Sequence, residues 1–189
     1  MAKKLHIGIV GAGGIARTQH VGGWQRVPDA EIRAVCDINR AAAKSVADEH
    51  GIPHVFSDFR DLVKLEELDV VDVCTPNKVH TPAVLAALAA RKHVLCEKPL
   101  AVSVNEVKQM QTAARKAGKL LMTAQHQRFS GISTAIKQYI EKHPIGEVYH
   151  ARIHAIRRNW LPIQPGFIDP ALSGGGPCMD IGVHALDTA

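Results

Sequence analysis

A glycine-rich loop near the start of the chain is the first group of residues whose type and spacing could do chemistry. It matches the pattern G-x-G-x-x-G/A and comprises Gly11, Ala12, Gly13, Gly14, Ile15 and Ala16. Gly11 permits a tight turn, Gly13 lets the backbone approach a diphosphate, and Ala16 keeps the next helix close to the strand. A plain turn also uses glycines, but here an apolar run precedes the loop and a helical segment follows it. The loop is therefore predicted to bind the diphosphate of a dinucleotide.

An acidic residue follows the second apolar run, about 20 residues after this loop. A carboxylate at Asp37 would accept hydrogen bonds from the adenosine ribose hydroxyls and repel a 2′-phosphate, so NAD is the preferred cofactor. Arg40 follows closely and could accommodate that phosphate, which keeps NADP as an alternative. Asp37 could also cap the next helix, and the two roles are compatible.

A lysine lies just past the fifth apolar run, in the sequence Cys96-Glu97-Lys98-Pro99. Ligands of doubly wound sheets bind at the carboxyl ends of the strands. A buried lysine there has a lowered pKa and can exchange a proton with a reacting alcohol. Pro99 would hold Lys98 in a fixed geometry, for which a cis peptide bond is one option. The alternative is an ordinary surface pair of Glu97 and Lys98.

The last group of candidate residues is a histidine with an aspartate on either side of it in the sequence. On a helix, Asp180 and His184 would share a face, and Asp187 would lie where it can orient the imidazole ring. His184 is a candidate acid or base, and Asp180 is a candidate anchor for substrate. A structural histidine is the alternative. A metal site is not predicted, because no third ligand accompanies Asp180 and His184.

The elements that must position these residues alternate regularly along the first 124 residues. Short apolar runs predict strands at 5–10, 31–36, 54–56, 70–74, 93–96 and 119–123. The segments between them predict helices at 15–27, 40–50, from Ser57 or Asp58 to 65, 78–90 and 103–117. Helical crossovers between successive strands imply a parallel, doubly wound α/β sheet that is covered on both faces.

The pattern changes after this region. A helix is expected at 133–142, a longer strand with one apolar face at 147–157, a loop at 160–177, and a helix from 179 to 189. We therefore predict a dinucleotide-binding domain at 1–124 and the beginning of a second α+β domain at 125–189. The uncovered edge of the strand at 147–157 suggests self-association into a homo-oligomer.

Taken together, the motifs resemble those of the glucose–fructose oxidoreductase, inositol dehydrogenase and MocA family (Gfo/Idh/MocA). In chain order they are the Gly11 loop, Thr75-Pro76-Asn77 with His80, Glu97-Lys98-Pro99, and Gly174-Gly175-Gly176 followed by Asp180, Gly182, His184 and Asp187. The resemblance implies that Lys98, Asp180 and His184 form the catalytic constellation. It also implies that Thr75, Asn77 and Glu97 contact the nicotinamide half of the cofactor. Pro76, His80 and Lys98 are further candidate cofactor-binding residues.

The resemblance also carries expectations about the rest of the molecule. Arg128, in the segment His126-Gln127-Arg128-Phe129, is expected to face substrate. Family members carry a large, open C-terminal sheet, of which this chain would contain only about one helix and one strand. We therefore expect a truncated second domain.

The expected activity is hydride transfer between a nicotinamide cofactor, NAD or NADP, and a sugar, cyclitol or related polyol. The alternative is a dinucleotide-binding module without catalysis.

Composition restricts the remaining classes of function. The chain has 189 residues, 46% hydrophobic and 22% charged, and a net charge of +5, which is ordinary for a globular protein. The basic residues are scattered, so nucleic acid is not an expected partner. No apolar stretch approaches the roughly 18 residues of a membrane span, and none of the four cysteines forms a CxxC pair. We therefore expect a cytoplasmic protein without disulfides, zinc or a membrane partner.

Overall fold

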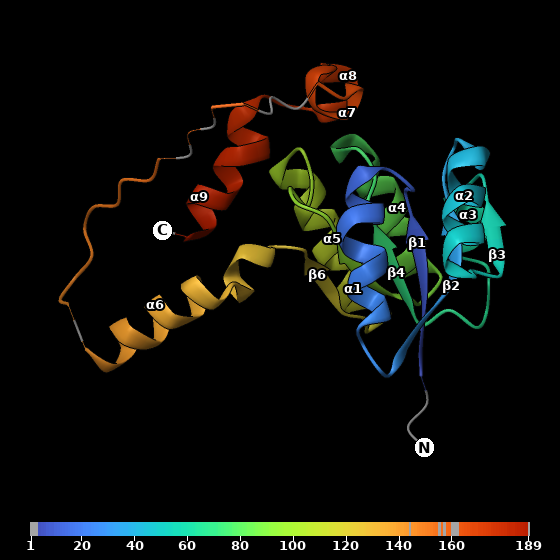
Figure 1. Cartoon of the computed structure of the whole chain (residues 1–189), viewed down its shortest axis with the longest axis horizontal. Coiled ribbons are helices and arrows are strands. Elements are labelled where there is room, and N and C mark those ends of the chain that lie inside the picture. The colour runs from blue at the N-terminus through green and yellow to red at the C-terminus, as the bar shows by residue number, and fades with distance from the viewer. Residues whose placement is uncertain (1–3, 144, 155, 157, 160–162, 189) are drawn as a thin grey trace.

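A computed structural model describes residues 4–143, 145–154, 156, 158–159 and 163–188, and a six-stranded sheet organises the first part of them (Figure 1). The strands are β1 (Leu5–Val10), β2 (Ala30–Cys36), β3 (His54–Phe56), β4 (Val70–Val73), β5 (His93–Cys96) and β6 (Leu121–Thr123). All neighbouring pairs are parallel, and the strand order is β3-β2-β1-β4-β5-β6. The predicted doubly wound sheet is confirmed, and its switch point lies between β1 and β4.

Helices cover this sheet on both faces, which explains why its strands are apolar runs rather than alternating patterns. One face carries η1 (Ala16–His20), α1 (Val21–Gln25) and α2 (Arg40–His50). The other carries α3 (Phe59–Leu62), α4 (Asn77–Ala89) and α5 (Val104–Ala117). The helix expected at 15–27 thus begins as a π-helical turn, η1, a feature that often marks functional sites.

Capping explains where several of these helices begin and end. Ser103 caps α5 by accepting from the Glu106 amide at 3.3 Å, and the Glu106 carboxylate accepts from the Ser103 hydroxyl. Asn39, rather than Asp37, caps α2. The helix expected at 78–90 is α4, which begins one residue earlier, at Asn77, and ends at Ala89.

Shorter elements follow the sheet. They are η2 (His126–Phe129), α6 (Gly131–Lys142), α7 (Pro165–Ile168), α8 (Pro170–Ser173), η3 (Cys178–Gly182) and α9 (Val183–Thr188). The helix expected at 133–142 is confirmed, with an earlier start because Ser130 caps it. The loop expected at 160–177 contains α7 and α8, although residues 160–162 lie outside the described part. The helix expected from 179 begins as a π-helical turn at Cys178, and Ala189 lies outside the described part.

The strand expected at 147–157 is wrong for the residues that the structure describes there. Residues 147–154 and 156 are exposed and carry no strand assignment. A strand exists only through hydrogen bonds to a neighbour, and the described residues supply none for this segment. Figure 1 shows it as an extended trace far from the sheet, after which α7 and α8 lie beside the sheet domain and η3 and α9 follow them. No helix among the described residues is long and apolar enough to cross a membrane.

Candidate active site

The glycine-rich loop crosses the carboxyl edge of the sheet next to the switch point. Gly11 has φ +102°, and a Cβ on it would lie 2.5 Å from the Cys74 carbonyl oxygen, so only glycine fits. Its amide donates to the Cys36 carbonyl at 2.7 Å, which ties the loop to the end of β2. At Gly13 a Cβ would meet nothing within 4 Å. The loop therefore presents bare backbone to open space, as a diphosphate site requires.

Asp37 lies beside this loop at the end of β2. One carboxylate oxygen accepts from the Ala12 amide at 2.8 Å, and the other accepts from the Asn39 amide at 2.8 Å. These bonds hold the carboxylate at the loop, while Arg40 is exposed at the start of α2. The position suits a contact with the adenosine ribose.

Residues after β4 lie across the switch point from Asp37, so they face the other end of a dinucleotide that spans the loop. The hydroxyl of Thr75 is buried and has no hydrogen-bond partner, which leaves it available to a ligand. Pro76 caps α4. The Asn77 side chain donates to the Ser173 carbonyl at 2.8 Å and so holds the C-terminal segment.

His80, which was expected to contact the cofactor, lies inside the fold. Its side chain is fully buried, with ring nitrogens 2.8 Å from the Pro99 carbonyl and 2.9 Å from the Thr75 carbonyl. Burial lowers the pKa of His80, and these hydrogen bonds only partly oppose the shift. His80 therefore joins the two loops that follow β4 and β5 and does not reach their surface.

Lys98 forms an ion pair with Asp180, which lies near the other end of the sequence. Its ammonium donates to the Asp180 carboxylate at 2.8 Å and to the Asp180 carbonyl at 2.9 Å, and the Lys98–Pro99 peptide bond is cis. The alternative of a surface pair between Glu97 and Lys98 is wrong, because the Lys98 ammonium pairs with Asp180 and its side chain is only 16% exposed.

His184 lies beside this pair, on α9. Its Nδ1 is buried without a hydrogen-bond partner, and its ring meets that of His126 edge-on at a centroid distance of 5.3 Å. Burial lowers the pKa of His184, and the positive charges of Lys98 and His126 lower it further. The structure thus brings together the three residues expected to be catalytic, with the imidazole in its neutral form.

The expected role of Asp187, a neighbour of this trio, is wrong. Asp187 does not orient His184; it pairs instead with Arg128 through three hydrogen bonds of 2.9, 2.9 and 2.6 Å. Arg128 therefore holds η2 against α9, and because its side chain is still 64% exposed, a contact with substrate stays a prediction. The strength of a bidentate arginine–carboxylate pair explains this preference.

A buried charged network under the site was missed from the sequence. The His20 ring bridges the carboxylates of Asp72, at 2.8 Å, and Glu97, at 2.9 Å, while the Trp24 indole donates to Asp72 at 2.6 Å. Burial opposes protonation, but the hydrogen bonds and charges of both acids outweigh it and raise the pKa of His20 to about 10. The sequence signal for this network was Asp72, an acid within an otherwise apolar strand. The structure buries its side chain fully, which requires polar partners.

The same network offers a ligand set that a metal could use. His20, Asp72 and Cys74 place one ligand atom each within 4.8 Å of one another. Both ring nitrogens of His20 already bond to carboxylates, however, and Trp24 uses the Asp72 oxygen that a metal would need. Burial also raises the pKa of the Cys74 thiol well above its ordinary value, which disfavours the thiolate. Hydrogen bonds therefore account for this cluster.

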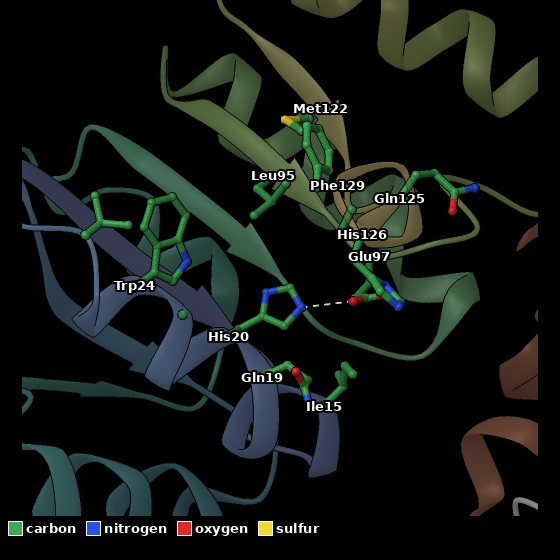
Figure 2. Close-up of a pocket in the computed structure, with 13 residues that line it drawn as sticks. Ile15, Gln19, His20, Trp24, Leu95, Glu97, Met122, Gln125, His126 and Phe129 are labelled. Atoms are coloured by element: carbon green, nitrogen blue, oxygen red, sulfur yellow. Dashed lines mark hydrogen bonds and ion pairs between the residues drawn. The ribbon is translucent and has the colours of Figure 1, made fainter. Parts of the chain in front are cut away.

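A cavity of about 600 Å³ opens over the network (Figure 2). Figure 2 shows His20 pointing from its helix toward Glu97, with the hydrogen bond between them drawn. Apolar and polar side chains both line the cavity. They are Ile15, Gln19, His20, Trp24, Val27, Leu95, Glu97, Met122, Gln125, His126 and Phe129, with Gly23 and Ala124.

Comparisons with known proteins identify the family. Residues 5–125 match the model of the Gfo/Idh/MocA oxidoreductase family with an NAD-binding Rossmann fold. Residues 133–189 match the Gfo/Idh/MocA C-terminal domain. The chain belongs to the Gfo/Idh/MocA family. Its first part is thus the family's NAD-binding Rossmann domain, as the sequence motifs indicated.

Individual relatives agree with this assignment. D-glucoside 3-dehydrogenase of Escherichia coli is 36% identical over 98% of this chain, and 1,5-anhydro-D-fructose reductase of Ensifer adhaerens is 35% identical over 96%. An oxidoreductase domain protein from Kribbella flavida has a TM-score of 0.85 at 27% identity over 99% of this chain and 53% of that structure. The chain spans about half the length of the curated relatives, 53% and 54% for the two enzymes named.

One solved relative contains ligands. The structure of scyllo-inositol dehydrogenase from Lactobacillus casei with bound NAD(H) and scyllo-inositol matches with a TM-score of 0.72 and 27% identity. The match covers 77% of this chain and 43% of that structure.

Proposed function

We propose that this chain provides the cofactor site and the acid–base residues of an NAD-dependent oxidoreductase acting on a sugar, cyclitol or related polyol. The convergence of Lys98, Asp180 and His184 at the carboxyl edge of the sheet carries the proposal. These residues lie on the β4–β6 side of the switch point, which is where the nicotinamide half of a dinucleotide bound at Gly11–Ala16 would extend. Relatives named as glucoside and inositol dehydrogenases support the substrate class.

The residues present fit the cofactor. The open space above Gly13, the Asp37 carboxylate beside the loop and the unpartnered Thr75 hydroxyl provide a diphosphate cradle, a ribose acceptor and a polar contact. Bound NAD supplies the ring that accepts the hydride. Asp37 favours NAD over NADP, and Arg40 is the residue through which NADP would be accommodated.

The acid–base chemistry follows from the proton positions. An ammonium has three donors, and Lys98 uses two of them on Asp180, so the third can point at the substrate hydroxyl. Neutral His184 accepts the proton that this hydroxyl loses. Asp180 fixes the ammonium and can accept from a neighbouring hydroxyl of the polyol.

A second candidate is a dinucleotide-binding module without catalysis. The observation in its favour is that the described residues after 143 form no second sheet, so nothing in that part supplies a wall for substrate. The glycine-rich loop and Asp37 do not depend on that segment.

NADH fluorescence titration combined with a panel of polyols separates the two candidates. The enzyme predicts binding and NAD reduction with at least one polyol, and a loss of about 10²–10⁴-fold in rate for His184→Ala or Lys98→Ala. Binding without turnover on every polyol supports the module. A chain that binds no NADH refutes both.

The cellular setting is also part of the proposal. The four cysteines are free, and three of them are buried. Unpaired cysteines are typical of a reducing compartment such as the cytoplasm.

A further inference from the structure

The His20 ring has an arrangement that fixes its charge state. Its side chain is 8% exposed, and its two nitrogens contact Asp72 and Glu97, whose side chains are 0% and 9% exposed. Ionised carboxylates only accept hydrogen bonds, so both ring nitrogens must carry protons. The ring is therefore an imidazolium held between two buried acids. Trp24 donates to the same Asp72 oxygen as His20, and the Cys74 thiol donates to the other oxygen at 3.7 Å.

The Glu97 carboxylate connects this imidazolium to the site. One of its oxygens accepts from His20 at 2.9 Å, and the other accepts from the backbone amide of Lys98 at 2.9 Å. Both oxygens of Glu97 thus have defined donors, and one of them is the main chain that presents the Lys98 ammonium to Asp180.

His20 connects the diphosphate side of the site with its nicotinamide side. His20 ends η1, the helical turn that follows the diphosphate loop, whereas Glu97 and Lys98 follow β5 on the nicotinamide side. His20 and Glu97 also line the cavity in Figure 2, so their bond lies at the wall of that cavity and not within the closed core.

We propose that His20 is a positioning residue that fixes the Glu97 carboxylate and, through it, the nicotinamide end of the cofactor site. This inference rests on the proposed function. Without the imidazolium, two buried carboxylates would face each other with no cation between them, and Glu97 would have to move or take up a proton. Movement of Glu97 would release the Lys98 backbone amide, and protonation of Glu97 would weaken its hydrogen bond to that amide. The diphosphate loop, held by Cys36 and Asp37, would keep its shape.

The test compares NADH with ADP-ribose, which keeps the adenosine and diphosphate but lacks the nicotinamide. Affinities of both ligands are measured by calorimetry for the full chain and for His20→Asn, which keeps one donor but removes the charge. The expected result is that NADH binds about tenfold more weakly or worse, while ADP-ribose affinity stays within about twofold. A variant whose two affinities fall equally, or neither of which falls, overturns the proposal.

Two further variants test whether His20 acts through Glu97. Trp24→Phe is the matched control, because it removes a donor to Asp72 but leaves Glu97 untouched, and it should keep both affinities. Glu97→Gln should repeat the effect of His20→Asn. The double variant should be no weaker for NADH than either single one, since coupled residues are not additive. Additive losses would show that His20 acts elsewhere.

ADP-ribose binding also reports folding. If His20→Asn alone fails to fold, the double variant should fold again, because it removes both the cation and one of its acids; a double variant that stays unfolded overturns the proposal. A wild-type chain that binds ADP-ribose but shows no added affinity for NADH also overturns it. A wild-type chain that binds neither ligand overturns the proposed function and this inference with it.

Discussion

At the scale of single residues, proton affinity decides what each histidine can do, and His184 is the first case. Burial and the positive charges of Lys98 and His126 lower its pKa below 6.5, so it is neutral at pH 7. Its contribution to stability is present above pH 6.5 and is lost as the pH falls through the lowered pKa. An NMR titration of the ring should give a midpoint below 6.5, and His126→Gln should move it upward. A wild-type midpoint at or above 6.5 would contradict this assignment.

The pKa of His20 is shifted in the opposite direction to that of His184. Its pKa is raised from 6.5 to about 10, so its contribution to stability is complete below pH 6.5 and is lost as the pH rises through 10. Between these values the free energy of unfolding should fall by up to about 1.4 kcal/mol per pH unit through this group. Urea unfolding at several pH values measures the slope. His20→Asn should abolish that part of the slope, and an unchanged slope would assign it to other groups.

Asp37 should determine the choice between the two nicotinamide cofactors. Asp37→Asn keeps the shape and an acceptor for the Ala12 amide but removes the charge that repels a 2′-phosphate. We expect NADPH affinity to rise by about tenfold and NADH affinity to fall less than that. Calorimetry with both cofactors measures the ratio. If the ratio does not change, Asp37 is only a support for the loop.

At the scale of elements, His80 joins the loops that follow β4 and β5. Replacing this buried ring leaves the carbonyl that accepts from its N–H unpartnered and creates a cavity, so His80→Ala should lower the free energy of unfolding by about 2–5 kcal/mol. His150→Ala is the control, because that histidine is exposed, and it should cost within about 0.5 kcal/mol. Urea unfolding compares the two variants. A cost for His80→Ala as small as the control's would mean that the loops do not depend on it.

Helices and strands were predictable where they depend on residues close in sequence, and contacts between distant residues were less predictable. The apolar runs, the glycine loop and the capping serine at 103 depend on neighbours in sequence, and the structure has them close to where they were expected. Lys98 and Asp180 are separated by 82 residues, so only the family resemblance suggested their meeting. His80 and Asp72 show the limit, because a side chain's burial depends on tertiary packing. The family resemblance suggested a cofactor contact for His80, and no motif pointed to Asp72.

At the scale of the whole molecule, the chain contains a dense sheet domain and a sparsely packed segment that still contributes to the site. The expected strand at 147–157 failed because strand pairing is a property of two segments, and the described residues offer this one no partner. Its residues alternate as in a strand with one apolar face, but the described residues of that face are exposed. Asp180 and His184 lie beyond this segment, and they reach Lys98 through the contacts of Asn77, Lys98 and Arg128.

This arrangement predicts the order in which a protease cuts the chain. Trypsin needs exposed, extended backbone, which the described residues 145–154 provide, so the first cut should follow Arg152. The sheet domain should survive as a resistant fragment that still binds ADP-ribose, since the glycine loop and Asp37 belong to it. Bound NADH should not slow the cut at Arg152. Mass spectrometry of timed digests gives the order, and early cuts within residues 4–124 would contradict the proposed division at residue 124.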